Sequence, residues 1–240
     1  MEDKDMVQTK VFQNFTSSFK EKQFKELKRK LTENGIECLL IGNYRIVKTD
    51  YDAIIITSFD IFVVEFKESL KEGAITVNDT CWTYSDGNMV WAGNHATTPF
   101  EQLRHKRNCL FGCLRRAAIG SKLFIKTMVV FSMPFSLKKG ETLLNDVYDD
   151  THGWFLTSTP DTMIYTLQKH TSVFDLKYKN QFESFASYFG ISQPIVIKRL
   201  LQKICALCFQ SSINLRNFLG IKRFSHSNRN TLFCIERINY

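Results

Sequence analysis

Residues 51–67 read YDAIIITSFDIFVVEFK and contain two apolar runs separated by a short turn. Both runs are short and rich in isoleucine, valine and phenylalanine, which is typical of buried strands. Three ionisable residues, Asp52, Glu65 and Lys67, lie near the ends of these runs, where an apolar strand has little reason to carry charge. The stretch therefore predicts a β-hairpin with a cluster of charges at one end.

The spacing within this hairpin predicts which residues face one another. Side chains alternate along a strand, so Glu65 and Lys67 share a face. If Ser58-Phe59 forms a two-residue loop, Asp52 lies opposite Glu65. Two facing carboxylates repel unless a cation lies between them, and Mg²⁺ is commonly held by one or two carboxylates with water and phosphate. The alternative is an ordinary ion pair at a strand edge, with Asp52 capping a turn.

The segments around the hairpin alternate between helical and extended patterns. Residues 18–33 have apolar positions at helical spacing, and Asn34-Gly35 ends this helix as a left-handed cap. Pro99 and the capping residue Thr98 begin a long second helix. Together the elements predict an α/β fold with a mixed central sheet flanked by helices. The expected order is helix 18–33, strands 36–41, 44–47, 53–57, 61–66, 74–77 and 82–84, a return strand 89–91, helix 98–118, strands 123–132 and 153–156, and helices 161–170 and 182–189.

Composition narrows the class of protein. A chain of 240 residues with 44% hydrophobic residues can bury a full core, and no apolar run is long enough to span a bilayer. The charged N-terminus lacks the apolar stretch of a secretory signal. Seven irregularly spaced cysteines do not form a disulfide pattern. We therefore expect a cytoplasmic protein in a reducing compartment, with no membrane partner.

The positive charge is concentrated at the C-terminus. The formal net charge is +8, and the residues from Lys198 onward contribute seven of these charges. We expect residues 1–189 to form the main domain and residues 190–240 a basic, partly helical C-terminal extension. A basic extension on a nearly neutral domain suggests a polyanionic partner, although a solvated basic surface is the simpler alternative.

The wider pattern resembles the nuclease-related domain (NERD) family of the PD-(D/E)xK, restriction-endonuclease-like superfamily. The resemblance covers roughly residues 18–170 and rests on Asp52 before a strand, the Glu65-x-Lys67 strand end, and Pro99-Phe100-Glu101-Gln102 at the start of the long helix. It implies that Asp52 and Glu65 bind the metal and that Lys67 is the catalytic lysine. It also implies that Gln102 and a glutamate on the first helix, for which we choose Glu21, belong to the active site.

The sequence departs from the family pattern at three places. Tyr51 replaces the proline that gives the superfamily its name, and Thr98 replaces the asparagine before the helix proline. The glycine–glutamate signature near the N-terminus is missing. These departures affect the assigned helix residues more than the Asp-Glu-Lys core.

From these features we expect a metal-dependent nuclease in which activated water hydrolyses phosphodiester bonds, in DNA rather than RNA. Mg²⁺ is the expected cofactor and Mn²⁺ a substitute. The alternatives are a binding module with the same fold but weak or lost catalysis, and a structural subunit. A homodimer or a protein partner is left open.

Zinc is not expected, because Cys205 and Cys208 lie in an apolar run and their partners are irregularly spaced. The residues expected to contact nucleic acid are Arg104, Arg107, Lys198, Arg199, Lys222 and Arg223.

Overall fold

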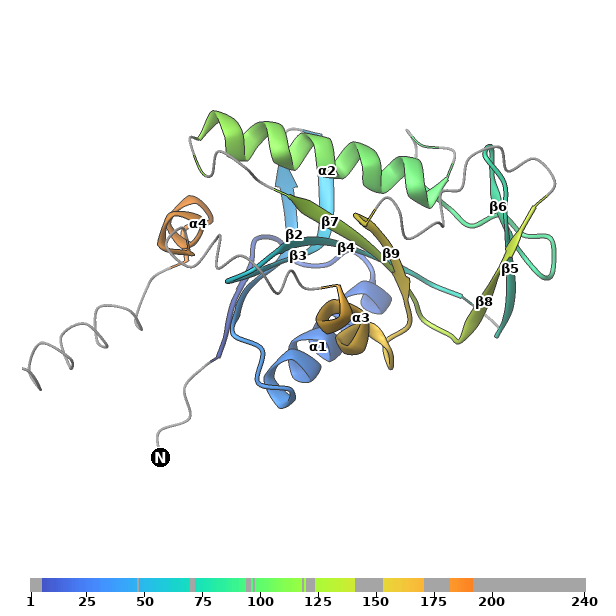
Figure 1. Ribbon diagram of the computed structural model, residues 1–240, viewed down its shortest axis with the longest axis horizontal. Coiled ribbons are helices and arrows are strands. Elements are labelled where there is room, and N and C mark those ends of the chain that lie inside the picture. Colours follow the sequence, from blue (N-terminus) through green and yellow to red (C-terminus); the bar gives the residue numbers. More distant parts are fainter. Residues whose placement is uncertain are drawn as a thin grey trace, which may run out of the picture. The chain divides into compact units, whose positions relative to one another are not determined.

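The computed structural model describes residues 6–46, 48–69, 72–93, 96, 98–117, 119, 124–140, 153–170 and 182–191. These residues form a six-stranded mixed sheet in the order β1-β2-β3-β4-β7-β9 and a small sheet in the order β6-β5-β8 (Figure 1). The expected α/β fold, a mixed sheet flanked by helices, is confirmed. The elements are β1 (Val7–Val11), α1 (Ser18–Glu33), β2 (Cys38–Ile46), β3 (Thr49–Thr57), β4 (Ile61–Lys67), β5 (Gly73–Val77), β6 (Trp82–Tyr84), α2 (Pro99–Arg116), β7 (Ile125–Phe131), β8 (Phe135–Lys139), β9 (Phe155–Ser158), α3 (Met163–Lys169) and α4 (Phe182–Tyr188).

The β3–β4 hairpin has the expected register. The antiparallel pairs run from Ala53 opposite Val64 to Ile56 opposite Ile61. The amide of Thr57 donates to the carbonyl of Asp60 at 2.9 Å, and this closes the two-residue loop. Because the Thr57 hydroxyl also accepts from the amide of Asp60 at 3.0 Å, a side chain stabilises a turn whose residues have no strong turn preference.

Helices cover both faces of the large sheet. In Figure 1, α2 lies on one side of the strands and α1 and α3 lie on the other. Phe24, Leu27 and Leu31 of α1 pack in the same hydrophobic cluster as residues of α3. The opposite cluster contains the buried stripe of α2, together with Phe185 of α4. The central strands are therefore buried on both faces, and β3, β4 and β7 end between two layers of helices.

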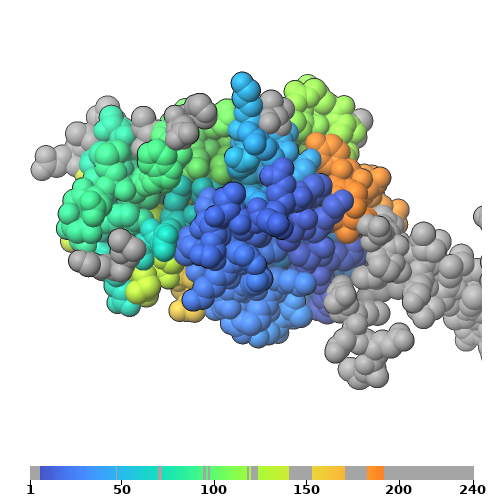
Figure 2. Space-filling model, turned by 180° about the vertical axis from the view of Figure 1, so that it is seen from behind, coloured from blue at the N-terminus to red at the C-terminus, as the bar shows by residue number. Residues whose placement is uncertain are grey.

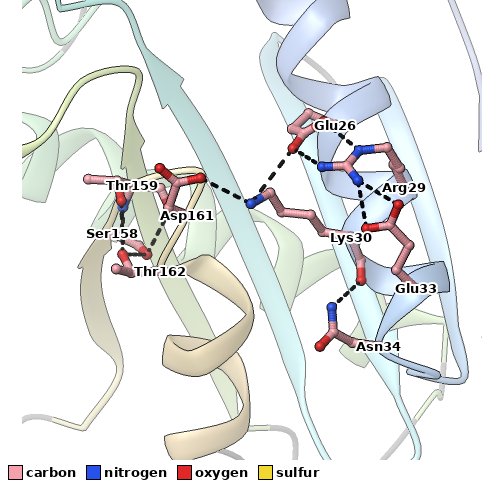
Figure 3. A network of polar contacts seen from close by, with 9 residues as sticks. All are labelled: Glu26, Arg29, Lys30, Glu33, Asn34, Ser158, Thr159, Asp161 and Thr162. Atoms are coloured by element: carbon pink, nitrogen blue, oxygen red, sulfur yellow. Dashed lines mark hydrogen bonds and ion pairs between the residues drawn. The ribbon is translucent and has the colours of Figure 1, made fainter.

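Polar contacts fasten α1 to the start of α3 (Figure 3). Lys30 lies 3.2 Å from a carboxylate oxygen of Asp161 and 3.7 Å from one of Glu26. On the outer side of α1, Arg29 pairs with Glu26 and Glu33. These exposed pairs contribute little stability individually, but the Lys30 contact ties two elements far apart in sequence.

Four details differ from the sequence expectations. Strands β1 and β8 were not predicted, and the two strands expected at 36–41 and 44–47 are one strand, β2. The backbone continues through Asn43, whose φ is 44°. Asn43 is held there because its side-chain amide donates to the carbonyls of Gln13 and Asn14. The return strand expected at 89–91 is a single bridge between Thr83 and Met89.

A buried ion pair lies where β4 begins. Asp60 is 1% exposed and Lys126 of β7 is 5% exposed, and their charged atoms are 2.9 Å apart. The Lys126 ammonium also donates to the carbonyl of His170. The pair therefore joins two neighbouring strands to the end of α3.

The chain divides into two units, Met1–Ser192 and Gln193–Tyr240. The second unit lies outside the described residues, as do Lys198, Arg199, Lys222, Arg223, Cys205 and Cys208. The basic, partly helical extension over 190–240 therefore stays a prediction. Within the described part of the chain, none of the helices combines the length and the apolar character needed to cross a membrane.

Candidate active site

A cluster of buried charges lies at the end of β4 opposite the Asp60–Lys126 pair. Asp52 comes from β3, and Glu65 and Lys67 come from β4. All three side chains are buried, with residue exposures of 4%, 1% and 7%. Two helices on opposite faces of the sheet complete the cluster, α1 with Lys20 and α2 with Lys106 and Gln102. The sequence-predicted trio is therefore brought together in space.

Asp52 is held by one contact on each oxygen. Its Oδ2 accepts a hydrogen bond from the backbone amide of Phe66 at 2.9 Å, and its Oδ1 lies 2.7 Å from the Lys20 ammonium. At this end of the hairpin, the last paired residues of β3 and β4 are Ala53 and Val64. The Asp52 carboxylate thus satisfies an amide of β4 beyond the end of the ladder, and this fixes its position.

Glu65 is the centre of the cluster. Its Oε1 accepts from the Gln102 side-chain amide at 3.0 Å and from Lys67 at 3.4 Å. Its Oε2 accepts from the Lys106 ammonium, and the Lys20 ammonium lies 3.9 Å from Oε1. Glu65 therefore interacts with a neighbour on its own strand and with two helices.

Lys67 is fixed by three acceptors. Its ammonium donates to the carbonyl of Trp91 at 2.5 Å and to Gln102 Oε1 at 2.7 Å, in addition to Glu65. Gln102 thus accepts from Lys67 and donates to Glu65, which orients both side chains. Gly93, whose φ is +85°, lies close enough that an added Cβ would be 3.4 Å from the Gln102 amide nitrogen. A glycine here lets the loop before α2 take a left-handed conformation beside the cluster.

Burial and neighbouring charges both shift the pKa values of these groups. Burial raises the pKa of Asp52, and the neighbouring Glu65 charge raises it further. Burial also favours the neutral form of Glu65, but Lys106, Lys67 and Lys20 outweigh it and lower its pKa to about 2. Burial lowers the pKa of Lys67. Two carboxylates with oppositely shifted pKa values are typical of catalytic sites, although structural ion pairs also shift pKa values.

The donor set determines which ion the cluster suits. Carboxylate oxygens are hard ligands, and one or two of them with water are the usual protein contribution to an Mg²⁺ site. Among the described residues no group of three or more His, Cys, Asp or Glu side chains is placed to hold a metal. Asp52 and Glu65 supply two carboxylates, which is the kind of donor that Mg²⁺ takes from proteins. In this arrangement the Lys20 ammonium lies against both carboxylates.

Glu21 is not placed in the cluster. Its carboxylate pairs with Lys25 at 2.6 Å, and its side chain is 46% exposed. It lines an open hollow on the outer side of α1 with Lys22, Lys25 and Arg29. The physical reason is helical phase: position 20, and not 21, continues the stripe of Phe24, Leu27 and Leu31 that faces the sheet.

The two arginines of α2 expected to contact nucleic acid have different surroundings. Arg104 is exposed and pairs with Glu101 at 2.6 Å. Arg107 is half-buried, donates to the carbonyl of Ile125 at 2.7 Å and lies over the Trp154 ring. Arg107 therefore has a packing role in the fold, and Arg104 remains at the surface.

Two cluster residues, Lys20 and Lys106, were not predicted from the sequence. The sequence nevertheless indicated both residues, because each lysine lies on the apolar stripe of its helix. Lys106 is seven percent exposed and shares the buried face of α2 with Leu103 and Leu110. A lysine on a core-facing stripe needs a buried partner, and so points to an acidic site beneath it.

A comparison with known protein families gives one match, and it covers the residues of this cluster. Residues 16–132 match the family model described as nuclease-related domain, NERD. The matched segment contains all six side chains of the cluster. No curated protein and no solved structure gives a significant match to the chain.

Proposed function

Because residues 16–132 form a nuclease-related domain, within the PD-(D/E)xK superfamily, we propose that the protein is a Mg²⁺-dependent nuclease that hydrolyses phosphodiester bonds in DNA. One observation carries the proposal: within the matched segment, Asp52 of β3 meets Glu65 and Lys67 at the end of the adjacent strand β4. Gln102 links Glu65 to Lys67, and the Lys20 ammonium lies against both Asp52 and Glu65. Phosphodiester hydrolysis needs such a set, a place for a cation, an activated water and a fixed positive charge.

In this proposal each residue of the cluster has its own role in the reaction. Asp52 and Glu65 hold Mg²⁺, which when bound activates water and neutralises charge on the phosphate. Lys67 presents a fixed ammonium that stabilises the charge developing on the phosphoryl oxygens. Gln102 positions Lys67 and Glu65 relative to each other through its two hydrogen bonds. Mn²⁺ serves as a substitute cation with the same hard ligands.

In this proposal substrate binding is assigned to an exposed aromatic ring and to basic side chains. Trp91 is 69% exposed, and its own carbonyl accepts from Lys67, so its ring lies on the loop beside the catalytic lysine. An exposed aromatic ring in this place can stack on a base. Arg104 and the basic residues from Lys198 onward supply phosphate contacts, which give affinity without sequence readout. The proposal keeps the cytoplasmic location expected from the sequence.

A second candidate function is a nucleic-acid-binding or protein-binding module with weak or lost cleavage. It is favoured by the contacts of the two carboxylates, because all four of their oxygens already accept hydrogen bonds from the protein. Three ammonium groups surround the two carboxylates, so the cluster has a formal charge of +1 without any added ion. Such a cluster attracts phosphate even if no metal binds.

A cleavage assay separates the two functions. Supercoiled plasmid, linear duplex, single-stranded DNA and RNA are incubated with the purified chain in Mg²⁺, Mn²⁺ or EDTA. We expect cleavage of DNA that requires the divalent cation and is lost in Glu65→Ala and Lys67→Ala. A matched control is Lys22→Ala, since Lys22 is an exposed lysine of α1 outside the cluster. Equal cleavage by all variants would identify a contaminant, and salt-sensitive binding without cleavage would support the binding module.

A further inference from the structure

We infer that Lys20 is an internal counter-ion that occupies the cation position between Asp52 and Glu65, and that its ammonium must leave before a divalent cation binds. The inference rests on the proposed metal site and adds a residue that controls its occupancy. Lys20 would thus set the metal affinity of this chain.

The Lys20 ammonium lies between the two carboxylates of the cluster. The Nζ atom of Lys20 is 2.7 Å from Asp52 Oδ1 and 3.9 Å from Glu65 Oε1. It therefore bridges two carboxylates that come from different strands, as a bound cation would. The other two lysines of the cluster, Lys67 and Lys106, form their ion pairs with Glu65.

Exposure separates Lys20 from the other two lysines. The side chains of Lys67 and Lys106 are each 8% exposed, whereas that of Lys20 is 34% exposed. Lys67 is also held by the Trp91 carbonyl and by Gln102. Lys20 has a flexible four-carbon stem on α1, which lies at the surface in the view of Figure 2. Of these three lysines, Lys20 is therefore the one that can swing into solvent without opening the core.

The helix itself does not favour a lysine at this place. Lys20 lies in the first turn of α1, three residues after the capping residue Ser17, whose side chain accepts from the Lys20 amide. The N-terminal end of a helix carries a partial positive charge, which disfavours a cation there. Asp52 and Glu65 offset this cost through their contacts with the ammonium. The ammonium is thus held by the two carboxylates that the metal also needs.

The charge count gives the direction of the effect. With Lys20 in place the cluster has two carboxylates and three ammonium groups, so a divalent cation must enter a site with a formal charge of +1. When the Lys20 ammonium is removed, the formal charge falls to zero and a carboxylate oxygen is freed. Removing this ammonium therefore strengthens divalent-cation binding.

Mn²⁺ binding measured by electron paramagnetic resonance tests the inference without any cleavage assay. The full chain is freed of metal with EDTA, dialysed and titrated with Mn²⁺ as wild type, Lys20→Met and Lys22→Met. We expect Lys20→Met to bind Mn²⁺ about tenfold more tightly than wild type, which corresponds to about 1.4 kcal/mol. Lys22→Met removes the same charge from the exposed side of α1 and should bind as wild type does.

Two further variants keep the result interpretable. Lys20→Gln preserves a polar side chain if Lys20→Met unfolds, and circular dichroism checks the fold of each. Adding Glu65→Gln to Lys20→Met should abolish the tighter binding, because it removes a ligand of the same site. Unchanged Mn²⁺ affinity in Lys20→Met and Lys20→Gln, or an equal gain in Lys22→Met, would overturn the inference.

The outcome is distinguishable from the fate of the proposed nuclease. Tighter Mn²⁺ binding by Lys20→Met without DNA cleavage by any variant supports the counter-ion role and refutes the nuclease. Metal-dependent cleavage by wild type, with no change of Mn²⁺ affinity in Lys20→Met, supports the nuclease and refutes the counter-ion role.

Discussion

Strand β4 has a buried charge group at each end, and the two groups differ in composition. At its start, Asp60 and Lys126 form an ion pair, with exposures of 1% and 5%. At its end, two carboxylates meet three ammonium groups, one of which is a third exposed. In the first group both charged side chains are almost fully buried. The second has an excess of positive charge and one side chain that reaches solvent.

The difference separates a structural ion pair from a functional site. A balanced, fully buried pair loses stability when one partner is removed, because the remaining charge has no water to solvate it. A cluster with unequal charge and an exposed member can exchange that member for another ion. Buried charge alone therefore does not identify a site; the imbalance and the exposed lysine do.

The largest expected effect is on stability at the start of β4. Asp60→Ala leaves Lys126 buried without its carboxylate, and we expect the free energy of unfolding to fall by about 3–5 kcal/mol. Lys20→Met, at the other end, should lower it by less than about 1 kcal/mol, because Lys20 is partly exposed. Urea denaturation followed by circular dichroism measures both. Equal losses would remove the distinction between the two groups.

Next in size is the effect of the buried lysine at the end of β4 on catalysis. Lys67→Met removes a fixed ammonium, and we expect the DNA cleavage rate in Mg²⁺ to fall about 10²–10³-fold. The rate is measured at saturating DNA by conversion of supercoiled plasmid to nicked and linear forms. Lys126→Met, checked for folding, is the control for loss of a buried lysine. A folded Lys67→Met with the wild-type rate would speak against the catalytic role.

A smaller effect is expected from Gln102, which positions Lys67 and Glu65 without contacting the metal. Gln102→Ala removes both hydrogen bonds and should lower the cleavage rate about 10–100-fold, as for other residues that orient metal ligands. Gln102→Glu keeps the acceptor for Lys67 and loses the donor to Glu65. We expect it to restore part of the rate, and no difference between the two variants would contradict a positioning role.

The smallest effect is expected at the surface beside the cluster. Trp91→Ala should weaken binding of single-stranded DNA about tenfold, since stacking of one base contributes roughly 1–3 kcal/mol. Fluorescence anisotropy with a labelled oligonucleotide measures the dissociation constant. Met89 is 64% exposed in the same segment, so Met89→Ala is a matched control. A similar change in both variants would argue against stacking by the indole ring.

Local sequence was sufficient to predict the centre of this fold. The register of β3 and β4 follows from the alternation of side chains and the length of one turn, both of which are local. Strands β1 and β8 were missed because they are short, partly exposed and pair in parallel with strands distant in sequence. Nothing local in such a segment distinguishes a paired strand from a loop.

For the site, Asp52, Glu65, Lys67 and Gln102 were named in advance, with the family resemblance supplying their roles. Glu21 was chosen because a glutamate was expected on the first helix. The stripe of α1 places Lys20 toward the cluster instead. The missed lysines could have been found by asking which helix positions face the sheet, since a charge there requires a partner.

The proposed active site requires that the end of β4 binds a divalent cation. Electron paramagnetic resonance can count Mn²⁺ bound per chain in the wild type and in Glu65→Gln, with Asp60→Asn as the control at the other end of the strand. We predict one bound Mn²⁺ per chain in wild type and in folded Asp60→Asn, and none in folded Glu65→Gln. Equal Mn²⁺ binding by wild type and folded Glu65→Gln would contradict the assignment of the cation site to Asp52 and Glu65.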